Sequence, residues 1–161
     1  MPKKRDRKIE IVVGDERHSF STAEEMLIDR DDLDTELAQQ AAHFGWFSVL
    51  RDSARMSRLR AEAAMDEKEN ELFLKYNEPS AEGKKPTVDT IKARVRTDPE
   101  YVEMVERYHQ ADYTERLLGS FVDALSQRKD MIVSLARSRH LEMSAPSADE
   151  VERIKKNLLG R

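Results

Sequence analysis

Cysteine is absent from the 161 residues of this chain, which excludes disulfides and thiolate chemistry and agrees with a reducing compartment. Glycine and proline occur only five times each, so the chain has few turns. Aromatic residues make up 6% and charged residues 37%, which is too little apolar bulk for a thick globular core. This balance is typical of long helices that pack along one stripe and complete their cores with other subunits.

Long hydrophobic runs are also lacking. The longest nearly uncharged stretch, residues 37–50, is too short and too polar to span a bilayer. The first residues, MPKKRDRKIEIVV, lack the apolar segment and cleavage site of a secretory signal. We therefore expect one cytoplasmic domain that does not enter a membrane.

The apolar pattern predicts a mostly all-α fold. Residues 1–30 form an N-terminal arm, with a β-hairpin around Gly14-Asp15 and a short helix capped by Ser21 and Glu24. Residues 31–140 form the core, a long antiparallel helical hairpin. Residues 141–161 form a linker and a C-terminal amphipathic docking helix whose apolar stripe is Val151, Ile154 and Leu158.

Breaks divide the core into its helices. No proline occurs from residue 31 to residue 76, where apolar residues keep a three-to-four spacing. Residues 77–86 break this helix, and Thr87 caps a short one that carries Ile91 and Val95. Asp98-Pro99 then starts a second long helix, which continues to about His140.

Cationic residues concentrate in 84-KKPTVDTIKARVR-96, which holds five cations and one anion although the chain carries −4 overall. A second cationic cluster lies near the end of the second long helix and comprises Arg128, Lys129, Arg137 and Arg139. Both clusters could line one track for a phosphate backbone, and the bland alternative is a solvated surface. The predicted nucleic-acid contacts are Lys84, Lys85, Lys92, Arg94, Arg96, Arg128, Lys129, Arg137 and Arg139.

Large apolar residues on the two long helices predict a subunit interface, since the chain has little core of its own. The predicted interface residues are Trp46, Phe47, Leu50, Leu118, Phe121, Leu125 and Ile132. Trp46 has a second interpretation as a base-stacking platform.

Catalytic patterns are scarce. Glu106-x-x-His109 is half of a di-iron carboxylate site, but no other histidine has a glutamate three residues earlier. Gly-rich phosphate loops, nucleophile elbows and Cys/His clusters are absent from the sequence. We expect a protein that is not an enzyme and has no cofactor or metal.

The sequence resembles the UvsY-type recombination mediators of phages over residues 40–140. The matching segments are HFGWFSVLR at 43–51, RLRAEA at 58–63, LFLKY at 72–76, IKARVRTDPEYV at 91–102 and DALSQRKDMIVSLARSR at 123–139. The resemblance implies a helical ring of six or seven subunits that binds single-stranded DNA in the host cytoplasm. It also implies that the ring helps a RecA-like recombinase displace the single-strand-binding protein.

The sequence departs from the family where the family's basic residues at the end of the first long helix correspond to Asn70 and Leu72. The arm and the C-terminal helix also lie outside the resemblance. The alternative prediction is a helical adaptor or scaffolding protein. In that case, segments of like charge along the chain would drive its self-assembly. A di-metal carboxylate protein is a third possibility.

Overall fold

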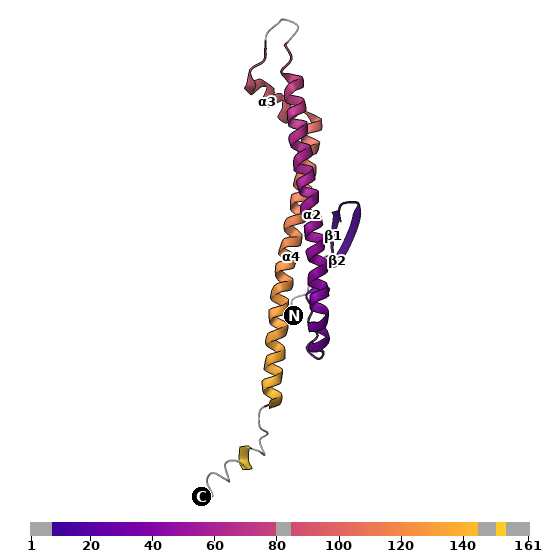
Figure 1. The fold of residues 1–161 in the computed structure, drawn as a ribbon, viewed down its shortest axis with the longest axis vertical. Helices are drawn as coiled ribbons and strands as arrows, with labels where there is room; N and C mark the ends of the chain where they lie inside the picture. Colours follow the sequence, from indigo (N-terminus) through magenta and orange to yellow (C-terminus); the bar gives the residue numbers. More distant parts are fainter. Residues whose placement is uncertain (1–7, 80–84, 145–150, 154–161) are drawn as a thin grey trace.

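The computed structural model of the chain describes residues 8–79, 85–144 and 151–153. The elements are β1 (Lys8–Val13), β2 (Glu16–Ser21), α1 (Thr22–Glu25), α2 (Leu33–Tyr76), α3 (Val88–Thr97) and α4 (Pro99–Ser144). The two long helices α2 and α4 run antiparallel side by side, with the β-hairpin against them and α3 where α2 ends (Figure 1). This confirms the predicted helical fold with its N-terminal hairpin.

Short polar residues start the helices as predicted. The Asp32 carboxylate accepts from the Thr35 amide at 3.2 Å, and the Thr87 hydroxyl accepts from the Thr90 amide at 3.3 Å. These bonds satisfy amides that have no partner within the helix. Asp98 accepts from the Glu100 amide at 2.9 Å and separates α3 from α4. The short helix predicted after Ser21 forms as α1 and ends at Glu25.

The larger hydrophobic cluster joins the β-hairpin to both long helices. β1 and β2 pair antiparallel, with Ile9 opposite Phe20, and Gly14 makes the turn with a φ of 63°. The ring of Phe20 lies 5.2 Å from that of Phe47 and 4.9 Å from that of Phe121, measured between centroids. An isolated two-stranded hairpin is marginal in water, so this aromatic contact accounts for its stability.

A smaller cluster lies at the other end of the molecule, which we call the tip: α3, the last turn of α2 and the first turn of α4. Leu72 of α2 packs with Ile91 and Val95 of α3, and all three are at most 2% exposed. The Tyr76 hydroxyl donates to the Asp98 carboxylate at 2.6 Å and ties the end of α2 to the start of α4.

Between the two clusters lies a shaft, residues 55–71 of α2 and 99–113 of α4, in which no side chain is buried. Its helices carry half-buried apolar side chains such as Met65, Met104 and Val105, and ion pairs in and beside the shaft join them. Arg58 reaches Glu115 at 2.6 Å, and Lys68 reaches Glu100 at 3.1 Å. Partly exposed pairs of this kind contribute at most about 1 kcal/mol each, so these ion pairs add little to stability.

The opposite end from the tip, where α2 begins and α4 ends, we call the open end. α4 continues to Ser144, four residues beyond the predicted end of the core. Of the predicted C-terminal helix, residues 151–153 are described and helical, and the rest lies outside the described residues. None of the described helices combines the length and the apolar character needed to cross a bilayer.

Candidate nucleic-acid interface

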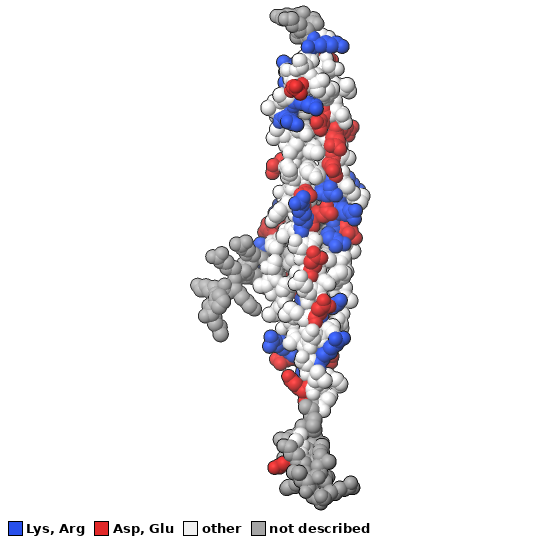
Figure 2. Space-filling view, turned by 90° about the vertical axis from the view of Figure 1, so that its left-hand side faces the viewer, with Lys and Arg blue, Asp and Glu red and all other residues white. Residues whose placement is uncertain are grey.

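The short helix α3 presents its cations because its apolar side is fixed. Ile91 and Val95 lie one helical turn apart and are 1% and 2% exposed, so they hold the helix onto Leu72. Lys92, Arg94 and Arg96 occupy other positions around the helix and are exposed. Figure 2 shows Lys and Arg side chains at this end of the molecule. Of the predicted contacts in this stretch, Lys84 lies outside the described residues.

Four cations of this stretch have no ion-pair partner among the residues that the structure describes, unlike Arg58, Lys68 and Arg107 of the shaft. Lys85, Lys92, Arg94 and Arg96 all share this property. In the shaft, by contrast, Arg107 is paired with Glu103 at 2.6 Å. A cation that has no carboxylate partner attracts an anionic ligand more strongly than one whose charge is paired.

The tip also holds a cation that the sequence interpretation missed. Lys75, in the last turn of α2, is exposed, and its Nζ lies 5.5 Å from the centroid of the Tyr76 ring. Lys75 precedes the break at residue 77 and lies outside the cationic segment 84–96. Only the folding of α3 back onto α2 brings it to the tip, beside the cations of that segment. Asp98 keeps its negative charge beside Lys75, and the attraction of Lys75 is among the causes that lower the pKa of Asp98.

The Tyr76–Asp98 contact also shifts the titration of both groups. The Tyr76 hydroxyl, and then the Glu100 amide, lower the pKa of Asp98 below its ordinary 3.8, while the same hydrogen bond raises the pKa of Tyr76 above 10.0. At neutral pH Asp98 is therefore ionised and Tyr76 is protonated, as this hydrogen bond requires.

The prediction that Arg128 contacts DNA is wrong. Its side chain is 7% exposed and points into the open end, where the guanidinium donates to the Leu27 carbonyl at 2.7 Å, to Glu36 and to Gln40. Gln40 in turn donates to the Leu125 carbonyl at 2.8 Å. Arg128 thus joins α4 to α2 and to the N-terminal arm, and it is not available to a phosphate.

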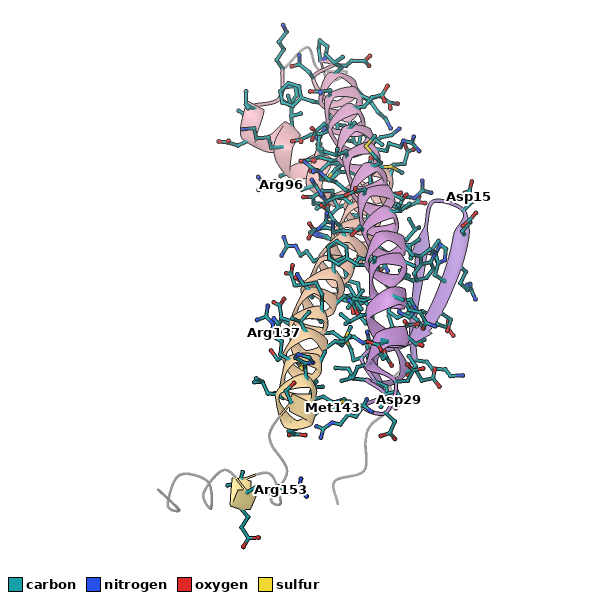
Figure 3. All side chains as sticks on the ribbon, turned by 60° about the horizontal axis from the view of Figure 1, so that its bottom comes forward. Asp15, Asp29, Arg96, Arg137, Met143 and Arg153 are labelled. Atoms are coloured by element: carbon teal, nitrogen blue, oxygen red, sulfur yellow. The ribbon has the colours of Figure 1, made fainter. Side chains whose placement is uncertain are left out.

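The other members of the second cluster are exposed but do not extend the tip. Lys129 pairs with Asp130 at 3.4 Å, and Arg139 donates to the Asp31 carbonyl at 3.2 Å. Arg96 and Arg137 lie at opposite ends of the hairpin (Figure 3). The helical rise places Arg137 about 57 Å along α4 from Pro99, the first residue of that helix. Within one chain the antiparallel hairpin separates the two clusters, so they do not line one continuous phosphate track.

No family model, curated protein or solved structure matches this chain.

Most of the predicted subunit interface is the chain's own core. Trp46 is 46% exposed, with its ring 6.0 Å from that of His18, but the other six residues are buried within the chain. All of them except Ile132 belong to the cluster that joins α2, α4 and the hairpin. Those buried residues are Phe47, Leu50, Leu118, Phe121, Leu125 and Ile132. The cause is the β-hairpin, which supplies the third layer that the sequence interpretation assigned to another subunit.

Glu106 and His109 are both exposed on the shaft. Within the described residues, no group of three or more His, Cys, Asp or Glu side chains is placed to hold a metal ion.

Proposed function

We propose that this chain is a non-enzymatic, single-stranded DNA-binding recombination mediator that contacts the phosphate backbone through its tip. The observation that carries the proposal is the set of four exposed cations, Lys85, Lys92, Arg94 and Arg96, on and beside a helix fixed by two buried residues. Lys75 adds a fifth positive charge at the same end.

Such a contact is electrostatic and nearly independent of base sequence. For single strands the logarithm of the binding constant falls by about 0.7 per neutralised phosphate as the logarithm of salt concentration rises. Four contacts in each chain therefore give a slope of about −3. Several copies acting together multiply a modest affinity, because each further contact is intramolecular.

The mediator role follows from the sequence resemblance. A protein that holds the strand by phosphates leaves the bases free, so it orders the strand without blocking the pairing surface that a RecA-like recombinase uses. Displacement of the single-strand-binding protein then becomes a competition for the same backbone. The proposed partners are the single strand, the recombinase, the single-strand-binding protein and further copies of the chain.

The test is fluorescence anisotropy with a labelled single-stranded oligonucleotide over a range of salt concentrations. The triple variant Lys92→Ala, Arg94→Ala, Arg96→Ala should reduce the slope by about 2 and weaken binding at every salt concentration. The control removes three cations from the shaft and its border, Arg51, Arg107 and Arg116, each of which is ion-paired. Equal losses in the two variants would show that net charge, not the tip, drives binding.

A second candidate, the helical scaffolding protein, is favoured by the apolar side chains exposed at the open end, among them Leu141 at 70% and Met143 at 79%. The same titration separates the candidates. A scaffold without a DNA role shows no salt-dependent binding of the strand near physiological ionic strength.

A further inference from the structure

The open end carries an apolar groove between α2 and α4, which we call the open-end groove. Two hollows of about 480 and 510 Å³ form it, and both are lined by Leu37 and Val133. Two large apolar residues of its lining, Phe44 and Leu141, are 40% and 70% exposed. Contiguous exposed apolar surface of this kind usually marks an interaction site.

The C-terminal segment, residues 145–161, has the side chains to cover this groove. Its sequence places Val151, Ile154 and Leu158 on one helical stripe. Residues 151–153 are described and helical. A helix of about 15 residues is marginal in water by itself, so the stripe needs an apolar surface on which to fold.

The groove and the segment have matching lengths. The groove runs along α4 from Ser126 to Leu141, a distance of about 22 Å by the helical rise. A helix over residues 147–161 would also be about 22 Å long. Residues 145–147 surround Pro146, which cannot continue a helix, and they are enough for a turn between antiparallel helices. Counted back from this turn, Leu158 comes level with Val133.

The charges of the groove and of the segment are complementary at the end where the chain turns. The ionisable residues that line the groove carry no negative charge, and they are Lys129, Arg137 and His140. The first half of the segment, residues 147–154, holds three carboxylates and one guanidinium. In an antiparallel arrangement this half lies beside Arg137 and His140, so opposite charges meet. The second half is cationic, and it lies where Lys129 already pairs with Asp130 at 3.4 Å.

The covalent connection favours the chain's own groove over the groove of another copy. A segment joined to its site by a short linker meets that site at an effective concentration in the millimolar range. Protein at micromolar concentration offers the grooves of other copies at about a thousandth of that value. A weak apolar contact is therefore populated within one chain before it forms between two.

We propose that the C-terminal segment folds back at Pro146 and packs its apolar stripe into the open-end groove of the same chain. In the structure residues 151–153 lie beyond the end of α4 and leave the groove uncovered (Figure 1). The segment is thus a strap that closes over the groove and removes its apolar side chains from water. This inference does not depend on DNA binding, because the groove lies at the end opposite the tip.

The experiment uses engineered cysteine pairs in the full chain, which has no cysteine of its own. A disulfide forms only where the two Cα atoms come within about 7 Å. The first test pair is Val133→Cys with Leu158→Cys. The control pair is Met131→Cys with Leu158→Cys, because Met131 is two residues from Val133 but about 200° around α4 from it. A second test pair, Leu37→Cys with Leu158→Cys, probes the groove from α2.

Each variant is oxidised with oxidised glutathione at micromolar protein concentration, and non-reducing electrophoresis separates linked monomers from linked dimers. The three helical positions lie outside the buried core, and circular dichroism checks that each variant remains helical. We expect both test pairs to form linked monomers at least about 10-fold faster than the control pair. Adding Ile154→Asp to the first test pair should lower its rate to that of the control, because a carboxylate interrupts the apolar stripe.

Three results would overturn the proposal. Equal rates for the Val133 and Met131 pairs would mean that the segment samples both sides of α4 without docking. Linked dimers in place of linked monomers would mean that the segment covers the groove of another copy. An unchanged rate with Ile154→Asp would mean that the apolar stripe does not make the contact.

Discussion

Arg128 gives the sharpest prediction for stability. Replacing it with methionine keeps the aliphatic stem but removes the guanidinium that bonds Leu27, Glu36 and Gln40. Glu36 is 17% exposed and would then lose its cationic partner while the arm stays folded around it. Removing one member of a buried ion pair costs about 3–5 kcal/mol, so we expect the free energy of unfolding to fall by about that amount.

The assay is urea unfolding followed by circular dichroism, at one protein concentration for all variants because association adds to apparent stability. Arg116→Met is the matched control: the same substitution on the same helix, at a side chain that is 79% exposed and pairs with Asp112 at 2.9 Å. It should cost less than about 1 kcal/mol. Equal losses in the two variants, or a loss below about 1 kcal/mol for Arg128→Met, would refute the reasoning. Arg128→Met should also leave the salt slope of strand binding unchanged.

Three further predictions concern the tip and the hairpin. Ile91→Ala should destabilise the tip by about 2–5 kcal/mol, seen as faster amide exchange in α3 than in α2, and uniform exchange would contradict two separate clusters. Tyr76→Phe should raise the pKa of Asp98 towards its ordinary 3.8, followed by NMR titration; the stability that this carboxylate contributes is present above that pH and is lost as pH falls through its lowered folded-state pKa. Phe20→Ala should cost about 3–5 kcal/mol and expose Trp46 further, which a red shift of its fluorescence would report; an unshifted spectrum would mean that the hairpin does not cover this region.

The helix starts were predictable because their causes are local. Thr87 and Asp98 cap through bonds to residues two or three positions away, so the sequence contains both partners. The helical hairpin was predictable for a similar reason, since a break of about ten residues between two long periodic segments favours antiparallel neighbours. The exposure of Lys92, Arg94 and Arg96 followed from the spacing of Ile91 and Val95.

The assignment of core and interface was not predictable in the same way. An apolar stripe records that a side chain is buried and not what buries it, so Phe47 and Phe121 fitted a subunit interface as well as a hairpin of the same chain. Arg128 did have a local signal: it occupies the stripe position between Leu125 and Ile132, both of which are completely buried. Its partners Leu27 and Glu36 lie about 100 residues away, so spacing alone does not find them.

The length of the shaft sets the distance between the tip and the open end, and it can change without changing the structure of either end. Since no buried side chain fixes its length, removing seven residues from each helix would shorten it by about 10 Å while keeping each face within about 20° of its original direction. A chain shortened in this way should keep its caps, its aromatic cluster and its tip. The distance between the tip and the open end can therefore vary in steps of two helical turns while the residues of both ends stay the same.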